Sequence, residues 1–166
     1  MKADTFKLAV DLGHELAERH QILVTAESCT GGGLASAITD VPGASQWFDC
    51  GFVTYSNLSK TRMLAIPDTL IRQYGAVSEA VALSMAKGAL DMSNGTLAIA
   101  TTGIAGPDGG TTEKPVGIVW FGLANRNHAY AVRQLFSGDR EVVRRQSIRH
   151  AVQMLLTFLR TKQVSF

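Results

Sequence analysis

Nucleophilic side chains follow an apolar run early in the chain, in the stretch "TAESCTGGGL". Ser28 and Cys29 are the candidate nucleophiles, and three glycines come directly after Thr30. The stretch lacks the lysine of a GxxxxGK[ST] phosphate loop, and Ser36 stands where a GxGxxG dinucleotide fingerprint needs its third glycine. ATP hydrolysis and dinucleotide binding therefore lose support. The remaining interpretation is a strand that delivers Ser28 to a helix N-terminus, whose N–H groups, those of residues 29–32 included, could hold an anion or an oxyanion.

A serine nucleophile also needs a base. The four histidines fall in or beside predicted helices or in a turn or strand, which weakens the case for a Ser/His/Asp triad. A lysine can replace histidine where burial lowers its pKa, and Lys60 is the best placed, five residues after Tyr55. The Tyr-x3-Lys pair of short-chain dehydrogenases would put the lysine where Ser59 stands. Plainer interpretations stay open: Ser28 as a helix cap, Cys29 as a small buried hydrophobe and Lys60 as an exposed side chain.

Two further segments carry polar groups of interest. Thr102 ends an apolar strand, and the glycine-rich loop 103–117 after it lets the backbone approach a ligand closely. Asp108 and Lys114 in this loop are more typical of a turn than of a ligand site, and without partner acids we propose no metal site. In "GDREVVRRQSIRH", Arg140 and Arg144 lie four apart on one helix face, whereas Arg145 pairs with Arg149 on another.

The elements that must position these groups follow from hydrophobic periodicity and turn residues. The order of helices and strands predicts one domain, residues 1–166, folded as a three-layer α/β/α sandwich with a mixed sheet. We expect helices over 6–17, 30–41, 67–75, 79–93 and 142–159, a short helical or irregular segment over 57–66, and strands over 22–26, 49–56, 96–103, 116–125 and 128–136.

Composition bounds the partners. The net charge of +2 is too small to indicate nucleic-acid binding. No apolar run is long enough to span a membrane, and the N-terminal residues do not have the pattern of a secretory signal. The two cysteines provide neither a disulfide framework nor a zinc cluster. We therefore expect a soluble, cytoplasmic protein that binds neither nucleic acid nor a membrane. The aromatic stretches "SQWFDCGF" and "VGIVWFGLA" are candidate contacts of a homo-oligomer.

Four motifs in order carry a resemblance to a known family: "TAESCTGGGLASAITDVPGASQWFDCGFVTYSN", "GAVSE", "TTGIAGPDGGTTEKPVGIVWFGLA" and "FSGDREVVRRQ". From about Leu8 to Leu156 the chain resembles the C-terminal domain of competence-damage-inducible protein A. The stand-alone members of that family are nicotinamide-nucleotide amidohydrolases, enzymes of pyridine nucleotide metabolism and NAD salvage. The resemblance implies hydrolysis of the carboxamide of nicotinamide mononucleotide to nicotinate mononucleotide and ammonia, without metal or cofactor.

The resemblance also implies roles for individual residues. The catalytic serine of the family falls on Ser28, its tyrosine on Tyr55 and its lysine on Lys60. Thr102 matches a Ser or Thr near the reacting group, and Arg140 or Arg144 matches the basic end of the site. The remaining candidates for substrate binding are the glycine-rich neighbours of these residues: Thr30, Gly31, Gly32, Gly103 and Gly106. A catalytically silent binding or interaction paralogue, and an amidase for another small amide, stay as alternatives.

Overall fold

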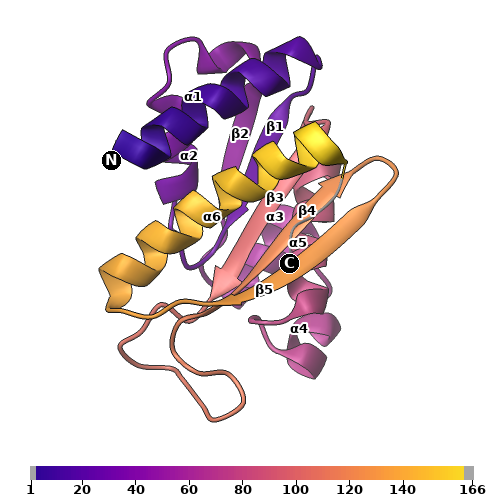
Figure 1. Cartoon of the computed structure of the whole chain (residues 1–166). Helices are drawn as coiled ribbons and strands as arrows, with labels where there is room; N and C mark the ends of the chain where they lie inside the picture. The colour runs from indigo at the N-terminus through magenta and orange to yellow at the C-terminus, as the bar shows by residue number, and fades with distance from the viewer. Residues whose placement is uncertain (1–2, 163–166) are drawn as a thin grey trace.

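A mixed sheet with strand order β2-β1-β3-β4-β5 runs through the computed structural model, which describes residues 3–162 (Figure 1). Strands β1 (Leu23–Glu27), β2 (Phe48–Val53) and β3 (Leu97–Gly103) are parallel to one another. Strands β4 (Ile118–Asn125) and β5 (Ala129–Leu135) form a hairpin, and β4 runs antiparallel to β3. The sheet is therefore parallel on one side of β3 and antiparallel on the other.

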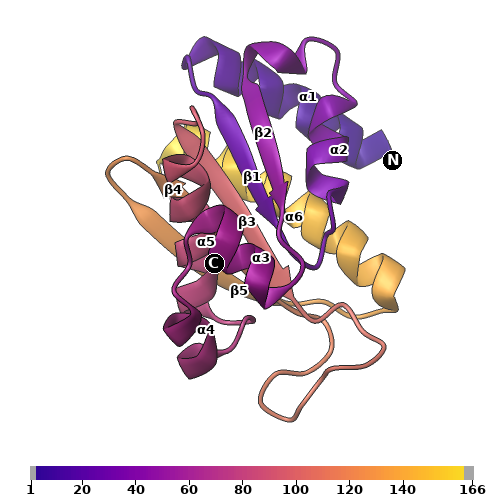
Figure 2. The ribbon, with the colours of Figure 1, turned by 180° about the vertical axis from the view of Figure 1, so that it is seen from behind.

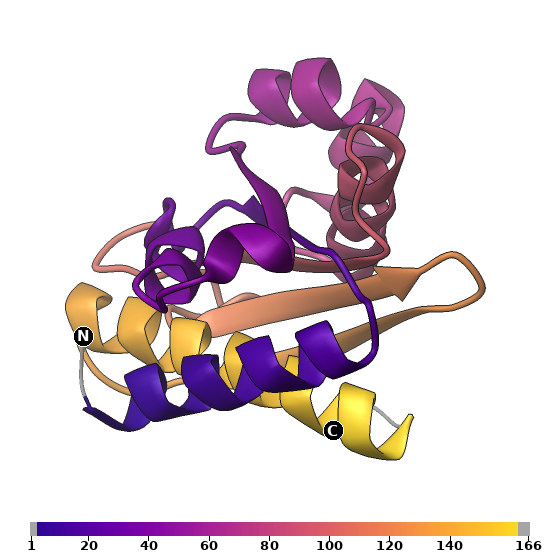
Figure 3. The ribbon, with the colours of Figure 1, turned by 90° about the horizontal axis from the view of Figure 1, so that it is seen from above.

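Helices cover both faces of the sheet (Figures 2 and 3). Helix α6 packs on α1 and α2 at one face, whereas α5 packs on α3, α4 and the other face. The predicted three-layer α/β/α sandwich with a mixed sheet is confirmed. The bounds are α1 (Ala3–Glu18), α2 (Gly33–Thr39), α3 (Asn57–Leu64), α4 (Asp68–Tyr74), α5 (Glu79–Asp91) and α6 (Arg140–Thr161), with a short 3-10 helix at Ala44–Gln46.

Two of the inner strands, β1 and β3, are nearly continuous apolar runs because both of their faces are covered. Every residue of β1 is buried, and so are the first six of β3. In β4 the side chains alternate between two cores: Phe121 packs in the cluster beneath α1 and α6, and Ala124 packs in the cluster beneath α5. No helix within residues 3–162 is long and apolar enough to cross a membrane.

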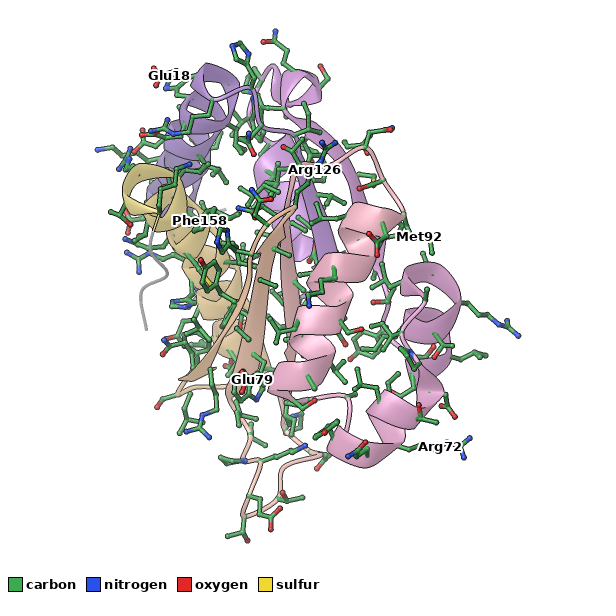
Figure 4. All side chains as sticks on the ribbon, turned by 90° about the vertical axis from the view of Figure 1, so that its right-hand side faces the viewer. Glu18, Arg72, Glu79, Met92, Arg126 and Phe158 are labelled. Atoms are coloured by element: carbon green, nitrogen blue, oxygen red, sulfur yellow. The ribbon has the colours of Figure 1, made fainter. Side chains whose placement is uncertain are left out.

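The strand register brings distant parts of the sequence to one edge of the sheet. Glu27 at the end of β1 pairs with Val53 on β2 and with Thr101 on β3. The residues that follow these strands therefore meet at the carboxyl edge of the parallel strands, where α/β folds bind their ligands. Glu79, the first residue of α5, lies toward this end of the molecule in Figure 4, whereas Met92 and Arg126 lie toward the opposite end.

Some element boundaries differ from those expected from the sequence. Helix α2 begins at Gly33 and not at Thr30. Gly31 and Gly32 both adopt positive φ, so the backbone before Gly33 is not helical. Strand β2 ends at Val53, so Tyr55 lies beyond it. Residues 57–64 form a true helix, α3, which begins with a capping box between Ser56 and Ser59.

We predict that Gly122→Ala destabilises the fold. Gly122 lies in β4 where α5 crosses it, and a Cβ there would overlap the main-chain oxygen of Ala82. Overpacking of this kind costs about 1–3 kcal/mol, so urea unfolding followed by circular dichroism should show a lower midpoint. Lys87→Ala on the exposed side of α5 is the control and should stay within about 0.5 kcal/mol of the wild type. Equal midpoints for Gly122→Ala and the wild type would contradict this account of the contact between β4 and α5.

Candidate active site

The candidate site is a cavity at the carboxyl edge of the parallel strands, with a volume of about 250 Å³. Ser28 follows β1, Tyr55 follows β2 and Thr102 lies near the end of β3. Helix α3 adds Lys60, and the first residue of α6 adds Arg140. The other residues that line the cavity are Cys29, Ala76, Val77, Gly103, Ile104, Ala105, Gly106 and Asp108.

Ser28 lies in a short turn between β1 and α2. Its N–H donates to the carbonyl of Thr101 at 2.9 Å, which extends the contact between β1 and β3 by one residue. The N–H of Gly31 donates back to the Ser28 carbonyl at 3.1 Å. The N-cap of α2 is Gly32, with no side-chain cap, so Ser28 is not the ordinary helix cap that its position allowed. Its hydroxyl instead accepts a hydrogen bond from Lys60 Nζ at 3.1 Å.

Lys60 is an almost fully buried lysine, with 1% of its surface exposed. Its ammonium also donates to the Thr54 carbonyl at 2.7 Å and lies 3.5 Å from the Tyr55 carbonyl, a long contact. No carboxylate of residues 3–162 lies within ion-pair distance of Nζ. Burial without a counter-charge lowers the pKa of Lys60 from 10.5 to about 8. In about a tenth of the molecules, the Lys60 amine is then neutral at pH 7.

The three oxygens around Nζ suit the neutral amine as a base. The carbonyls of Thr54 and Tyr55 are acceptors only, so the two N–H bonds of a neutral amine can point at them. The lone pair then remains for the hydroxyl of Ser28. This arrangement can draw the proton from Ser28 and raise its nucleophilicity.

Tyr55 and Arg140 form a second pair at the cavity. Tyr55 is 60% exposed, and its hydroxyl accepts a hydrogen bond from Arg140 Nη2 at 2.9 Å. Arg140 Nη1 donates to the Gly106 carbonyl at 2.8 Å. The main-chain carbonyl of Tyr55 is the atom of this residue that lies near Nζ, and its hydroxyl contacts Arg140 instead.

The loop after β3 forms another wall of the cavity. Thr102 is 1% exposed and donates through Oγ1 to the Ala76 carbonyl at 2.8 Å, which ties β3 to the segment between α4 and α5. Gly103 and Gly106, two of the candidates for substrate binding, also line the cavity. Asp108, which we interpreted as a turn residue, lies on the cavity wall too.

Sequence reasoning assigned no role to Ala76 and Val77. They belong to the stretch "GAVSE" between α4 and α5, and they line the cavity because α5 begins at the carboxyl edge of the sheet. The signal available in the sequence was the N-cap at Ser78, which places the preceding residues at a helix start. A helix start alone does not say which end of the sheet it faces.

The other predicted binding residues lie in the turn between β1 and α2, here called the serine turn, or contact it, and they do not line the cavity. Thr30 is fully buried, and its hydroxyl shares a 2.7 Å hydrogen bond with that of Thr101. Arg144 donates through Nη2 to the Thr30 carbonyl at 2.9 Å and lines a separate surface depression. Gly31 and Gly32 supply the positive φ values of the turn. In this arrangement Arg144 supports the turn, and Arg140 is the arginine that reaches the cavity.

The start of α2 differs from our expectation of free N–H groups there. The buried carboxylate of Glu27 accepts from the N–H of Leu34 at 2.9 Å and from that of Ala35 at 2.8 Å. This internal anion takes the place that a substrate anion would need. Of residues 29–32, Gly31 uses its N–H within the turn. Cys29 is the member of that segment that lines the cavity.

The Cys29 thiol is buried, and burial raises its pKa to about 12. The thiolate is therefore scarce at neutral pH, and Cys29 packs as a small hydrophobe in the core cluster beneath α1 and α6. Across residues 3–162, no group of three His, Cys, Asp or Glu side chains is placed to hold a metal ion. The nucleophile that this geometry supports is Ser28.

Comparison with known proteins identifies the family of this chain. The family described as CinA C-terminal domain matches residues 5–159. The chain is 50% identical over 149 residues to "Nicotinamide-nucleotide amidohydrolase PncC" of Pseudomonas putida, covering 90% of this chain and 93% of the relative. It is 47% identical over 154 residues to the protein of the same name from Escherichia coli K12, covering 92% and 93%.

A solved structure gives the same result for the fold. The crystal structure of "competence/damage inducible protein CihA" from Agrobacterium tumefaciens superposes with a TM-score of 0.93 at 39% identity, covering 97% of this chain and 98% of that one. The family match spans all the residues that line the cavity, from Ser28 to Arg140. The chain therefore belongs to the CinA C-terminal domain family.

Proposed function

We propose that this protein hydrolyses the carboxamide of nicotinamide mononucleotide to nicotinate mononucleotide and ammonia. The observation that carries the proposal is the 3.1 Å contact between Ser28 Oγ and the buried Nζ of Lys60. The names of relatives that are about half identical over nearly the whole chain support the same reaction. The cavity beside this pair, about 250 Å³, is bordered by an arginine suited to an anionic substrate.

The first half of the reaction acylates the enzyme. Neutral Lys60 takes the proton of Ser28 while Oγ attacks the amide carbon, giving a tetrahedral oxyanion. The N–H of Cys29, directly after the nucleophile, is the donor we assign to this oxyanion, a contribution of about 3 kcal/mol in well-studied hydrolases. The Lys60 ammonium then returns the proton to the amide nitrogen. The carbon–nitrogen bond breaks, and ammonia leaves an ester on Ser28.

The second half repeats these steps with water. Lys60 accepts a proton from water as the water oxygen attacks the ester carbon, and it protonates Ser28 Oγ as the ester bond breaks. One water is consumed, and nicotinate mononucleotide and ammonia are the products. Arg140 provides the charge for the substrate phosphate at the rim of the cavity, and the exposed ring of Tyr55 borders the same rim.

We predict that Ser28→Ala lowers ammonia release from nicotinamide mononucleotide by about three orders of magnitude or more, because the variant lacks the hydroxyl that hydrogen-bonds to Lys60. Ammonia release by the wild type, the variant and the control is measured with nicotinamide mononucleotide, nicotinamide riboside and nicotinamide. The preferred substrate also distinguishes this proposal from two alternatives, an amidase for another amide and a silent binding protein. Ser36→Ala, on the exposed side of α2, is the matched control. Turnover of Ser28→Ala at the wild-type rate would remove Ser28 as the nucleophile.

The pH dependence should report Lys60. The base must be neutral, so kcat/KM is expected to rise with pH and to level off above the Lys60 pKa of about 8. Lys60→Met should lose most of kcat and lack this rise. Its melting temperature should match or exceed that of the wild type, because burying an ammonium costs free energy below pH 8.

Two controls accompany the Lys60 experiment. Lys87→Met on the exposed side of α5 should keep the wild-type profile, and a chelator should leave the rate unchanged. A profile of Lys60→Met that still rises around pH 8 would show that another group is the base.

Arg140 should discriminate between phosphorylated and unphosphorylated substrates. We predict that Arg140→Gln raises KM for nicotinamide mononucleotide about tenfold or more and changes KM for nicotinamide riboside much less, because only the former carries a phosphate. Arg145→Gln, whose exposed partner is Glu141 on the same helix, is the matched control. An equal rise with both substrates would assign Arg140 to holding Tyr55 and Gly106 instead of the phosphate.

A further inference from the structure

Glu27 is a buried carboxylate beside the nucleophile that the proposed reaction does not use. It is 0% exposed, and none of the ion pairs found within residues 3–162 includes it. Its two oxygens accept separate hydrogen bonds, Oε2 from the N–H of Leu34 and Oε1 from that of Ala35. Thr25 Oγ1 lies 3.5 Å from Oε1. The charge is therefore held chiefly by the first main-chain N–H groups of α2, which hydrogen-bond strongly to an anion.

The main chain of Glu27 reaches the base as well as the nucleophile. Its carbonyl accepts from the N–H of Thr54 at 2.8 Å, and the carbonyl of Thr54 in turn accepts from Lys60 Nζ at 2.7 Å. The next residue along the chain is Ser28. Glu27 thus acts on both groups. Its side chain fixes the Ser28 turn, and its main chain binds Thr54, whose carbonyl accepts the hydrogen bond of Lys60.

The contacts of the carboxylate also close the turn on its far side. Residues 28–33 form a loop whose ends are joined by Glu27 to Leu34 and Ala35, and the Gly31–Ser28 hydrogen bond lies inside it. Gly31 and Gly32 allow this loop many backbone conformations, so the position of Ser28 depends on the contacts that fix the two ends of the loop. Glu27 does not line the cavity and cannot contact the substrate there.

We propose that Glu27 is a positioning residue for the deamidation: its carboxylate ties the Ser28 turn to α2 and so keeps Ser28 Oγ in reach of Lys60 Nζ. The inference rests on the function proposed above. Replacing one oxygen by an amide NH₂ should break one of the two contacts, because glutamine has a single acceptor oxygen and its nitrogen would face an N–H donor. The hydroxyl of Ser28 would then lose its fixed distance to the base.

The experiment compares Glu27→Gln with Asp40→Asn, a carboxylate-to-amide change at the exposed C-terminal end of α2. Ammonia release from nicotinamide mononucleotide gives kcat and KM across pH, and circular dichroism gives the melting temperature. For Glu27→Gln we expect kcat to fall about 10- to 100-fold at every pH, with KM within about twofold of the wild type. Asp40→Asn should keep both constants.

Several results would overturn the inference. They are an unchanged kcat in the folded Glu27→Gln variant, a rise in KM as large as the fall in kcat, or the loss of the rise of activity with pH, which would make Glu27 a proton-transfer group. If Glu27→Gln is unfolded at the assay temperature, Glu27→Asp, which keeps the charge but is one methylene shorter, is measured in the same way and should show the same fall in kcat with unchanged KM. A wild-type rate in Glu27→Asp would count against positioning.

A substrate-independent measurement separates this inference from the proposed function. The rate at which a fluorophosphonate probe labels Ser28 depends on Ser28 and Lys60 and not on the natural substrate. We expect Glu27→Gln to slow labelling about as much as it lowers kcat. If the wild type is labelled but releases no ammonia from nicotinamide mononucleotide, the substrate assignment fails and slower labelling of Glu27→Gln still supports positioning. A wild type that is neither labelled nor active overturns both.

Discussion

The contact between Ser28 and Lys60 is the constraint on which the rest of the site depends. It requires the side chain of Lys60 to be 1% exposed while its nitrogen contacts two main-chain oxygens and a hydroxyl and forms no ion pair within residues 3–162. Such a placement costs folding free energy, and the fold offsets that cost elsewhere, in the closely covered strands β1 and β3. A carboxylate beside Nζ would stabilise the charge, but it would also keep the amine protonated and unable to act as a base.

Charged side chains near the site have two different roles: some bind the main chain, and one lies at the cavity. Glu27 binds main-chain N–H groups in the first turn of α2, and Arg144 binds a main-chain carbonyl of the serine turn. Arg140, one helical turn before Arg144, lies at the cavity instead. Because the start of α2 already holds an internal anion, the positive charge available to a phosphate is that of α6. The helix dipole that the glycine-rich stretch first suggested serves the protein's own carboxylate.

The sequence predicts much of this fold because its signals are local. The apolar runs of β1 and β3, the cap at Ser78 and the position of Lys60 after a strand all lie within short windows. The mixed sheet follows from the order of the elements. Local patterns could not predict three contacts of the site. These are the hydrogen bond between Tyr55 and Arg140, that between Arg144 and Thr30, and the binding of the Glu27 carboxylate to N–H groups of α2. Each depends on residues brought together by tertiary packing, which periodicity does not encode.

The position of Arg140 makes the cavity depend on segments that are far apart in the sequence. Residues 28–60 supply the proposed nucleophile and base, but the arginine that reaches Tyr55 and Gly106 begins α6. That helix packs on α1, which precedes both of these segments in the sequence. The wall that Arg140 adds to the cavity therefore rests on contacts made on the other side of the sheet from α3, the helix that carries Lys60.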